Sequence, residues 1–362
     1  MGKKIICYID TLQLGGAERV MANLCNHLVE KGNDVVLIND LEPTKKLKEY
    51  EIDSRVERIF LDKCKSKNRV LNNIYRVIML RKSIQEQKAS VIISFLGPPN
   101  LRMLIATIGL RLKKIVSVRN DPKREYGVGV KKIVSNLLFG LADGVVFQTK
   151  EASEYFNITT QKKAAIIANP VKLSFFNQKQ LEENDSIVVI GRLQPQKNPS
   201  LVLNAYRQIK EEFPTTTLDF YGEGELKENL IKTINRYGLQ DNVFFHGQVS
   251  NTSEILASAK VYVLSSDYEG MPNALMEAMA VGIPIISTNC PCGGPKCLIE
   301  NSEQGFLVNV GDANEIAEHL RIILSEKTLR DKMRVAARKR AEDFKPEKIF
   351  KQWLEYINKV CG

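Results

Sequence analysis

A short segment near residue 270 combines carboxylates, glycine and proline in a pattern that can bind a phosphorylated sugar. It spans Ser265–Ala280 and reads S-S-D-Y-E-G-M-P-N-A-L-M-E-A-M-A. A strand is expected to end at Leu264 and a helix to begin near Asn273, a good N-cap whose following amides suit a phosphate. Glu269 can accept hydrogen bonds from sugar hydroxyls, and Glu277, one turn into the helix, can reach a ribose diol. On spacing alone, two surface carboxylates fit equally well.

Two series of alternating strands and helices can position this segment. Nearly continuous apolar runs are typical of buried parallel strands. The expected strands are Lys4–Tyr8, Val35–Ile38, Val91–Phe95, Ile115–Val118, Val145–Phe147, Ala165–Ile167, Ile187–Ile190, Leu218–Tyr221, Val243–Phe245, Val261–Leu264 and Ile283–Ile286. Helical patterns such as Ala17–Lys31, Leu71–Gln87 and Val130–Leu141 separate the first of them. We therefore predict two doubly wound, Rossmann-like α/β domains that bind ligands in the cleft between them.

The boundaries of these domains follow from composition. Pro170 breaks any regular element, and Gln178–Asp185 is charged and poor in apolar residues. We expect a first domain over residues 1–170, a second over residues 171–345 and a final helix over residues 346–362. That helix carries Phe350, Trp353, Leu354 and Ile357 at helical spacing. The pattern leaves open whether it covers the second domain or crosses back to the first.

Length and composition narrow the class of protein. The chain has 362 residues, of which 26% are charged and 44% hydrophobic, as in ordinary soluble proteins of two domains. No apolar run reaches the roughly 18 residues of a spanning helix, and the start is too short for a signal peptide, so we expect a cytoplasmic location. Seven scattered cysteines favour reduced thiols over a disulfide framework.

The excess positive charge lies in the first domain. Residues 1–170 hold 29 Lys and Arg against 17 Asp and Glu, a balance of +12, whereas the remainder has a balance of −2. An anionic membrane surface, a phosphorylated substrate, nucleic acid or a merely solvated basic face would each account for this. No zinc-finger, RNA-recognition or helix-turn-helix pattern is evident, which disfavours nucleic acid.

The segment around Glu269 resembles a known family. E-G-M-P-N-A-L-M-E, from Glu269 to Glu277, is similar to the Glu-x7-Glu signature of family-4 retaining glycosyltransferases. The resemblance covers almost the whole chain and implies the GT-B fold, in which two Rossmann-like domains enclose a cleft. It implies that Glu269 orients the sugar of a nucleotide-sugar donor and that Glu277 holds the ribose. It also places Gly270, Met271, Pro272 and Asn273 beside the donor.

Two further motifs of the family follow its order along the chain. Gly15 and Gly16, in L-G-G-A-E-R, resemble the glycine loop beside the donor phosphates, although an ordinary βα turn reads similarly. The loop is not G-x-G-x-x-G, which disfavours a dinucleotide. Gly191, Arg192 and Lys197, in G-R-L-Q-P-Q-K-N, resemble the motif whose Arg and Lys neutralise the donor diphosphate. With those two cations, no metal and no cofactor other than the donor are expected.

The chain shares a third motif with the family and differs from it at one position. Gly247 and Val249, in F-F-H-G-Q-V, resemble the segment near the nucleobase. Many relatives place a histidine after the fourth or fifth strand of the first domain, whereas this region reads S-V-R-N-D-P. The histidines of the chain are His27, His246 and His319. We expect Arg119 or Asn120 to take the missing position on the acceptor side, where either can bind an acceptor phosphate.

Three cysteines form a separate motif. Cys290, Cys292 and Cys297 supply three thiols without a nearby fourth ligand, whereas zinc prefers four, so a metal site is disfavoured. The wording C-P-C-G-G-P resembles a subgroup of bacterial enzymes that extend lipid-linked saccharides in N-glycan, O-antigen or capsule assembly. That resemblance implies a polyprenyl-diphosphate-linked saccharide as acceptor.

A basic segment of the first domain suits such an acceptor. Lys63–Arg69 precedes a helical pattern whose apolar residues are Leu71, Ile74, Val77, Ile78 and Ile84, with Arg76, Arg81 and Lys82 alongside. A basic amphipathic helix can lie on the anionic inner-membrane surface or hold a polyprenyl diphosphate head group. A helix that turns its apolar face to the core fits the same pattern.

Taken together, the sequence predicts a retaining glycosyltransferase at the cytoplasmic face of the membrane. It would move a hexose or an N-acetylhexosamine from a UDP-sugar to a lipid-linked saccharide and form an α-linkage, with Glu269, Arg192 and Lys197 in the catalytic roles. A UDP-sugar epimerase of the same fold and a catalytically idle sugar-nucleotide-binding relative are the alternatives. The missing histidine argues against the first, and the intact motif set argues against the second.

Overall fold

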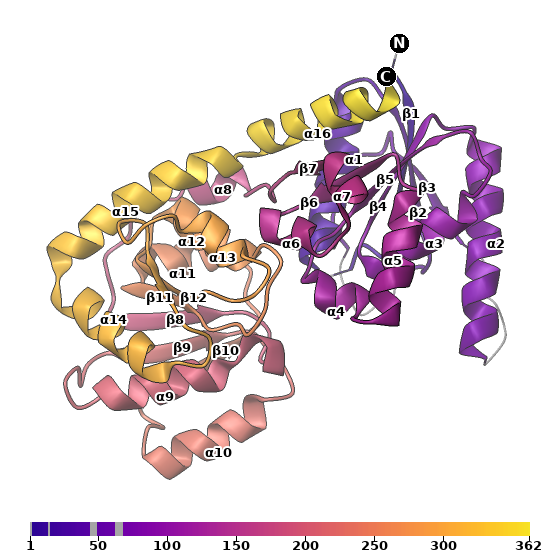
Figure 1. Ribbon diagram of the computed structural model, residues 1–362. Helices are drawn as coiled ribbons and strands as arrows, with labels where there is room; N and C mark the ends of the chain where they lie inside the picture. The colour runs from indigo at the N-terminus through magenta and orange to yellow at the C-terminus, as the bar shows by residue number, and fades with distance from the viewer. Residues whose placement is uncertain (1, 14, 44–48, 62–67) are drawn as a thin grey trace. The chain divides into compact units, whose positions relative to one another are not determined.

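The computed structural model describes residues 2–13, 15–43, 49–61 and 68–362. The chain forms two compact units (Figure 1). The N-terminal unit comprises Met1–Asn169 together with Glu347–Gly362, and the C-terminal unit comprises Pro170–Pro346. The final helix, the yellow end of the ribbon, therefore belongs to the N-terminal unit, which resolves the alternative that its pattern left open.

The N-terminal unit is built on a parallel sheet of seven strands in the order β3-β2-β1-β4-β5-β6-β7. The strands are β1 (Lys4–Ile9), β2 (Asp34–Asn39), β3 (Glu57–Phe60), β4 (Val91–Phe95), β5 (Lys113–Ser117), β6 (Gly144–Phe147) and β7 (Ala164–Ile166). Strand β1 is in register with β2 and β4 on its two sides, as its buried apolar run requires. The order reverses beside β1, and this is where doubly wound sheets bind ligands.

The helices of this unit connect successive strands and cover the sheet. They are α1 (Gly16–Glu30), α2 (Arg69–Gln87), α3 (Gly97–Ala106), α4 (Pro122–Tyr126), α5 (Val130–Gly140), α6 (Lys150–Glu154), α7 (Ile158–Lys162) and α16 (Pro346–Cys361). Helix α16 buries Trp353, whose ring lies 5.6 Å from that of Phe95 on β4, and its Tyr356 hydroxyl accepts from the Val145 amide at 2.7 Å. These contacts attach the last helix to the first sheet.

The C-terminal unit contains a parallel sheet of six strands in the order β10-β9-β8-β11-β12-β13. The strands are β8 (Ser186–Ile190), β9 (Thr217–Tyr221), β10 (Val243–Gly247), β11 (Val261–Leu264), β12 (Ile285–Thr288) and β13 (Phe306–Val308). The connecting helices are α8 (Leu173–Phe176), η1 (Pro195–Lys197), α9 (Pro199–Ile209), α10 (Lys227–Tyr237), α11 (Thr252–Ser258), α12 (Asn273–Val281), α13 (Gly294–Leu298), α14 (Ala313–Ser325), α15 (Lys327–Ala341) and η2 (Glu342–Phe344).

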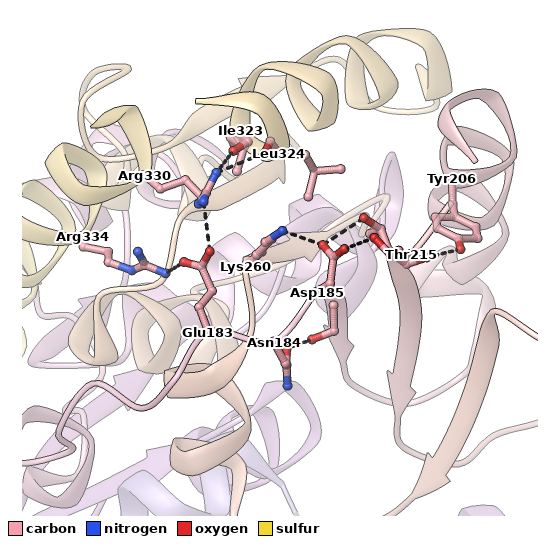
Figure 2. A network of polar contacts seen from close by, with 12 residues as sticks. Glu183, Asn184, Asp185, Tyr206, Thr215, Lys260, Ile323, Leu324, Arg330 and Arg334 are labelled. Carbon is pink, nitrogen blue, oxygen red and sulfur yellow. Dashed lines mark hydrogen bonds and ion pairs between the residues drawn. The ribbon is translucent and has the colours of Figure 1, made fainter. Parts of the chain in front are cut away.

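The charged stretch expected to join the domains is bound to the C-terminal unit at its end (Figure 2). Glu183 pairs with Arg330 at 2.9 Å and also with Arg334 of the same helix, α15. Asp185 pairs with Lys260 at 2.6 Å, just before β11. These ion pairs fix the entry to β8, so the polar composition of this stretch reflects anchoring rather than a free linker.

The two Rossmann-like α/β sheets confirm the predicted fold class, with three local corrections. Strands β3 and β13 escaped prediction because both are short edge strands, and β3 carries Glu57 and Arg58. Strand β12 begins at Ile285, two residues later than expected, because Gly282 ends α12 in the left-handed conformation and Pro284 has no amide for the ladder. Asn273 is the first residue of α12 and not its cap, which is Pro272.

Candidate functional site

Two loops of the C-terminal unit are hydrogen-bonded to each other at the carboxyl ends of neighbouring strands. One follows β8 and the other follows β11. The Ser265 hydroxyl donates to the Lys197 carbonyl at 2.8 Å, and the Asp267 amide donates to the Gln196 carbonyl at 2.8 Å. The Asn198 side chain donates to Asp267 Oδ1 at 2.9 Å. These bonds bring the G-R-L-Q-P-Q-K-N motif beside the Glu269 segment, although the two lie about 70 residues apart.

Lys197 and Glu269 form the centre of this arrangement. Lys197 Nζ donates to Glu269 Oε1, and the Ser266 hydroxyl donates to the same oxygen at 2.7 Å. Glu269 is only 7% exposed, while about a fifth of the Lys197 side chain, 21%, remains open. A buried carboxylate needs such partners to stay charged. The geometry therefore keeps an anion and a cation together at the edge of the sheet, where either can meet a bound ligand.

Helix α12 begins directly beyond Glu269. Its first turn lies at the carboxyl edge of the sheet, and Glu277, 8% exposed, lies one turn inside it. Tyr262 on β11 is fully buried close to both carboxylates, and burial, reinforced by Glu269 and Glu277, raises the pKa of its hydroxyl well above the usual value. The hydroxyl has no hydrogen-bond partner within the described part of the chain. The amide end of α12 and two flanking carboxylates thus form one constellation.

The loop that carries the cysteine motif touches the Glu269 segment. A Cβ built on Gly294 would lie 1.8 Å from the Gly270 carbonyl oxygen, so the two loops touch backbone to backbone. The Thr288 hydroxyl donates to the Ser266 carbonyl at 2.6 Å. Burial, with a smaller contribution from Glu269, raises the pKa of the Cys290 thiol to about 12. Among the described residues, no group of three or more His, Cys, Asp or Glu is arranged to hold a metal ion.

The other donor-side candidates of this unit lie on adjacent loops. Gly191 and the exposed Arg192 follow β8, and the Gly191 amide donates to the Tyr221 carbonyl at 2.9 Å. Gly247 ends β10 with φ +67°, a conformation that favours glycine. Val249 lies two residues beyond it and is half-buried. His246 stacks on Tyr221 with ring centroids 4.4 Å apart, as a packed strand residue does.

The remaining candidates belong to the N-terminal unit. Gly15 is the N-cap of α1 and Gly16 its first residue, which places both at the carboxyl end of β1. Arg119 is buried, donates to Asn169 Oδ1 at 2.9 Å and lies over the Phe95 ring at 4.1 Å. Burial lowers the pKa of its guanidinium to about 9. Asn120 is half-buried, and its side chain accepts from the Asp121 amide at 2.9 Å.

A second polar cluster in this unit escaped the sequence analysis. Arg102 on α3 donates to Asp10 Oδ1 at 2.8 Å and to the Tyr8 hydroxyl at 2.6 Å, and it also pairs with the buried Asp40. Asp10 and Asp40 directly follow β1 and β2, so their positions at strand ends were the available signal. Ser266 in the other unit carries the same signal, two residues beyond β11. Arg102 gives no such signal, because a single arginine in a helical pattern is most simply interpreted as a surface residue.

The Asp10–Arg102 cluster opens into a cavity of about 840 Å³ between α2 and α3. Arg76 of α2 lies beside it, 3.9 Å from Asp40. The apolar wall of the cavity consists of Ile74, Val77, Ile78, Pro98, Leu101 and Ile105. The cavity is therefore amphiphilic, because it has charged groups at one end and an aliphatic wall along the rest.

The expected basic segment is described in part. Lys63–Lys67 lie outside the described residues, and the side chain of Arg69 is not described. Helix α2 leaves Leu71, Ile74 and Ile78 more than half exposed and buries Ile84. The apolar residues of α2 therefore pack into the core only in the C-terminal half of the helix. No helix among the described residues is long and apolar enough to cross a membrane.

Two family models divide the chain between them. Residues 14–175 match the model "Glycosyltransferase Family 4", and residues 171–340 match "Glycosyl transferases group 1". The chain belongs to glycosyltransferase family 4. This is a retaining family with the GT-B fold, and the two sheets of this glycosyltransferase have that architecture.

Relatives of this glycosyltransferase extend over its full length. The GalNAc-α-(1→4)-GalNAc-α-(1→3)-diNAcBac-PP-undecaprenol α-1,4-N-acetyl-D-galactosaminyltransferase of Campylobacter jejuni is 27% identical over 363 residues, covering 99% of each chain. The N-acetylgalactosamine-N,N'-diacetylbacillosaminyl-diphospho-undecaprenol 4-α-N-acetylgalactosaminyltransferase of the same species is 28% identical and covers 98% of this chain and 99% of that protein.

A solved structure has the same fold. The crystal structure of Anabaena Alr3699/HepE in complex with UDP and glucose superposes with a TM-score of 0.83 at 16% identity, covering 98% of this glycosyltransferase and 99% of that chain. At this identity the likeness establishes the fold.

Proposed function

We propose that this glycosyltransferase transfers a hexose or an N-acetylhexosamine from a UDP-sugar to a saccharide carried on a polyprenyl diphosphate, with formation of an α-linkage. The observation that carries the donor half of the proposal is the Lys197–Glu269–Ser266 cluster at the start of α12. The relatives named for transfer to undecaprenyl-diphosphate glycans, and the UDP complex of the structural neighbour, support the substrate classes.

The donor roles follow from the positions of the groups. Arg192 is exposed where the diphosphate is expected, and Lys197 neutralises charge next to it. The amide end of α12, with Gly270, Met271, Pro272 and Asn273, faces the same negative charge. Glu277 holds the ribose, and Gly247 and Val249 border the base. For Gly15 and Gly16 of the N-terminal unit we propose a role beside the donor phosphates, because the glycine motif of the family implies it.

The chemistry requires charge stabilisation at the leaving group. As the glycosidic bond to the diphosphate breaks, negative charge develops on the departing phosphate, and fixed cations lower the energy of that state. Glu269, held in place by Lys197 and Ser266, accepts hydrogen bonds from the sugar hydroxyls and orients the ring. No step requires a metal ion, since Arg192 and Lys197 supply the positive charge. The acceptor oxygen bonds to the anomeric carbon on the face that the phosphate leaves, and the departing phosphate oxygen takes the proton of that hydroxyl. The configuration is therefore retained.

The amphiphilic cavity between α2 and α3 supports a lipid-linked acceptor. Its aliphatic wall suits the first isoprene units, and Arg76 and Arg102 at the charged end suit a diphosphate. Asn120 supplies a half-buried amide on the same edge of the N-terminal sheet. Arg119 lies deeper, and its Nε and Nη2 have no hydrogen-bond partner within the described residues, so it remains an acceptor-side candidate. We propose that the enzyme meets this lipid-embedded acceptor at the cytoplasmic face of an anionic membrane.

A donor and acceptor screen tests the proposal. UDP-GalNAc, UDP-GlcNAc, UDP-galactose and UDP-glucose are each incubated with a short-chain polyprenyl-diphosphate saccharide, and UDP release and product mass are measured. We expect one donor to give acceptor-dependent release. Conversion of a UDP-sugar without acceptor would instead assign an epimerase, and binding of UDP-sugar without turnover for any acceptor would assign an idle relative. Either result overturns the proposal.

A further inference from the structure

Helix α5 of the N-terminal unit presents its aliphatic face to solvent. Val130, Ile133, Val134, Leu137 and Leu141 follow the spacing i, i+3, i+4, i+7 and i+11, which is one face of a helix. Their exposed fractions are 75%, 61%, 49%, 71% and 43%, respectively. The residues that α5 buries are Ser135 and Phe139. The helix is thus anchored by one aromatic ring and turns its main apolar stripe away from the core.

This stripe continues across a layer of neighbouring helices. Helix α3 packs against α2 on one side and α5 on the other, and α5 also packs against α7. The structure describes 21 exposed large apolar side chains, and 13 of them lie on these four helices or on the loops at their ends. Soluble proteins scatter such residues singly, so a gathering on one layer marks an interaction surface.

The residue types and charges of the stripe indicate what kind of partner it binds. Residues 128–141 contain no Asp or Glu, and the exposed Lys131 and Lys132 lie among the apolar positions. Two further exposed cations, Lys123 and Arg124, precede them on α4. Protein interfaces favour Tyr, Trp, Phe, Met and Arg at their centres, whereas this stripe consists of Val, Ile and Leu. Aliphatic side chains bordered by lysines are what the boundary between anionic head groups and acyl chains accepts.

We propose that the outer face of α5, formed by Val130, Ile133, Val134, Leu137 and Leu141 with the cations around it, docks on the surface of an anionic lipid bilayer. The helix lies in the plane of the head groups, its aliphatic stripe enters the acyl region, and Lys131 and Lys132 contact lipid phosphates. This extends the membrane partner of the proposed function to a defined surface. Its test is independent of sugar transfer, because lipid binding is measured without donor or acceptor.

A pair of matched double variants of the full chain tests the surface. One carries Ile133→Asp and Leu137→Asp on α5. The control carries Ile231→Asp and Val335→Asp on α10 and α15 of the C-terminal unit, where the native side chains are 40% and 70% exposed. Both change the net charge equally and replace exposed helical residues. Co-sedimentation is measured with phosphatidylcholine vesicles that contain or lack phosphatidylglycerol, and circular dichroism checks the fold of each variant.

The expected result is binding of the wild type and the control to phosphatidylglycerol vesicles, with weaker binding at high salt. We expect the α5 variant to bind about tenfold less or weaker still. Equal binding of the α5 variant and the control would overturn the proposal. So would a wild-type dimer that the α5 substitutions convert to a monomer without affecting lipid binding, because the stripe would then join two copies. UDP release with a water-soluble acceptor separates this result from the fate of the proposed function, since α5 lies outside the donor groups.

Discussion

Lys197 and Glu269, 72 residues apart in the chain, form an ion pair at the point where the loops after β8 and β11 meet. The pair unites the two motifs that the sequence suggested separately, one for the diphosphate and one for the sugar. In this state the lysine neutralises the carboxylate. When a diphosphate arrives, Lys197 has a second anion within reach, and Glu269 retains the hydroxyl of Ser266.

Glu269→Gln is expected to lower kcat by about 10² to 10³ with little change in the fold. Gln keeps the shape and accepts one hydrogen bond, but it removes the charge that orients the sugar and faces the developing positive charge at the ring. UDP release under saturating donor measures the effect. The control is Glu318→Gln on α14, which is exposed and belongs to none of the donor motifs. Full turnover by purified Glu269→Gln would remove Glu269 from the catalytic groups.

Lys197→Met and Arg192→Met are expected to differ in stability although both reduce transfer. Removal of Lys197 leaves the buried Glu269 carboxylate without its cation, which costs about 1–3 kcal/mol of unfolding free energy. Arg192 is exposed, so its removal should leave stability within about 0.5 kcal/mol of wild type. Urea denaturation and UDP release on the same preparations separate the two effects. Equal stability of the two variants would show that Glu269 does not depend on Lys197.

Gly294→Ala is expected to impair both stability and transfer. The new methyl group would lie 1.8 Å from the Gly270 carbonyl, so the cysteine loop has to move away from the start of α12. We expect a cost of about 1–3 kcal/mol and a kcat about tenfold lower. Gly140→Ala is the matched control, since nothing lies within 4 Å of a Cβ at that position. If Gly294→Ala transfers sugar at the wild-type rate, the cysteine loop does not position the donor groups.

Glu125→Gln is expected to flatten the pH dependence of stability. Burial raises the pKa of the Glu125 carboxyl from 4.5 to about 7, so the folded state holds its proton more tightly than the unfolded chain. Its contribution is therefore complete below about pH 4.5 and is lost as the pH rises through 7. The variant should remove a decline of up to about 3 kcal/mol across that window. Denaturation curves between pH 5 and 8 measure it, with the exposed Glu154→Gln as control; parallel curves for wild type and Glu125→Gln would contradict it.

Glu183→Ala is expected to destabilise the C-terminal unit by about 1.5–3 kcal/mol. The substitution removes the carboxylate that Arg330 and Arg334 share (Figure 2). Their side chains are only 7% and 13% exposed, so the lost ion pairs are costly. Thermal unfolding measures the loss, and Glu182→Ala, one residue earlier and exposed, is the control. Identical melting of the two variants would mean that the network does not hold the entry to β8.

The sequence predicted the periodic and chemically marked features of the molecule and missed those that depend on the fold. Continuous apolar runs predict buried strands such as β4 and β11. The Glu269–Glu277 motif is recognisable from its amino-acid sequence. Asp10 follows a strand, which is a signal, but its partner Arg102 lies 92 positions away and no local pattern marks that arginine. The outward stripe of α5 has the same spacing as a core-facing stripe, so only the structure distinguishes the two.

The assignment of α16 to the N-terminal unit has a consequence for the order in which the protein is made. Trp353 and Tyr356 complete the core of the first sheet, yet the ribosome adds them only after the whole C-terminal unit. The unit whose synthesis begins first is therefore finished second, after the continuous residues 170–346 of the other unit have emerged. During that interval the surface later covered by Trp353 is open to water. A chain that stops before Trp353 would therefore be unable to close its first core.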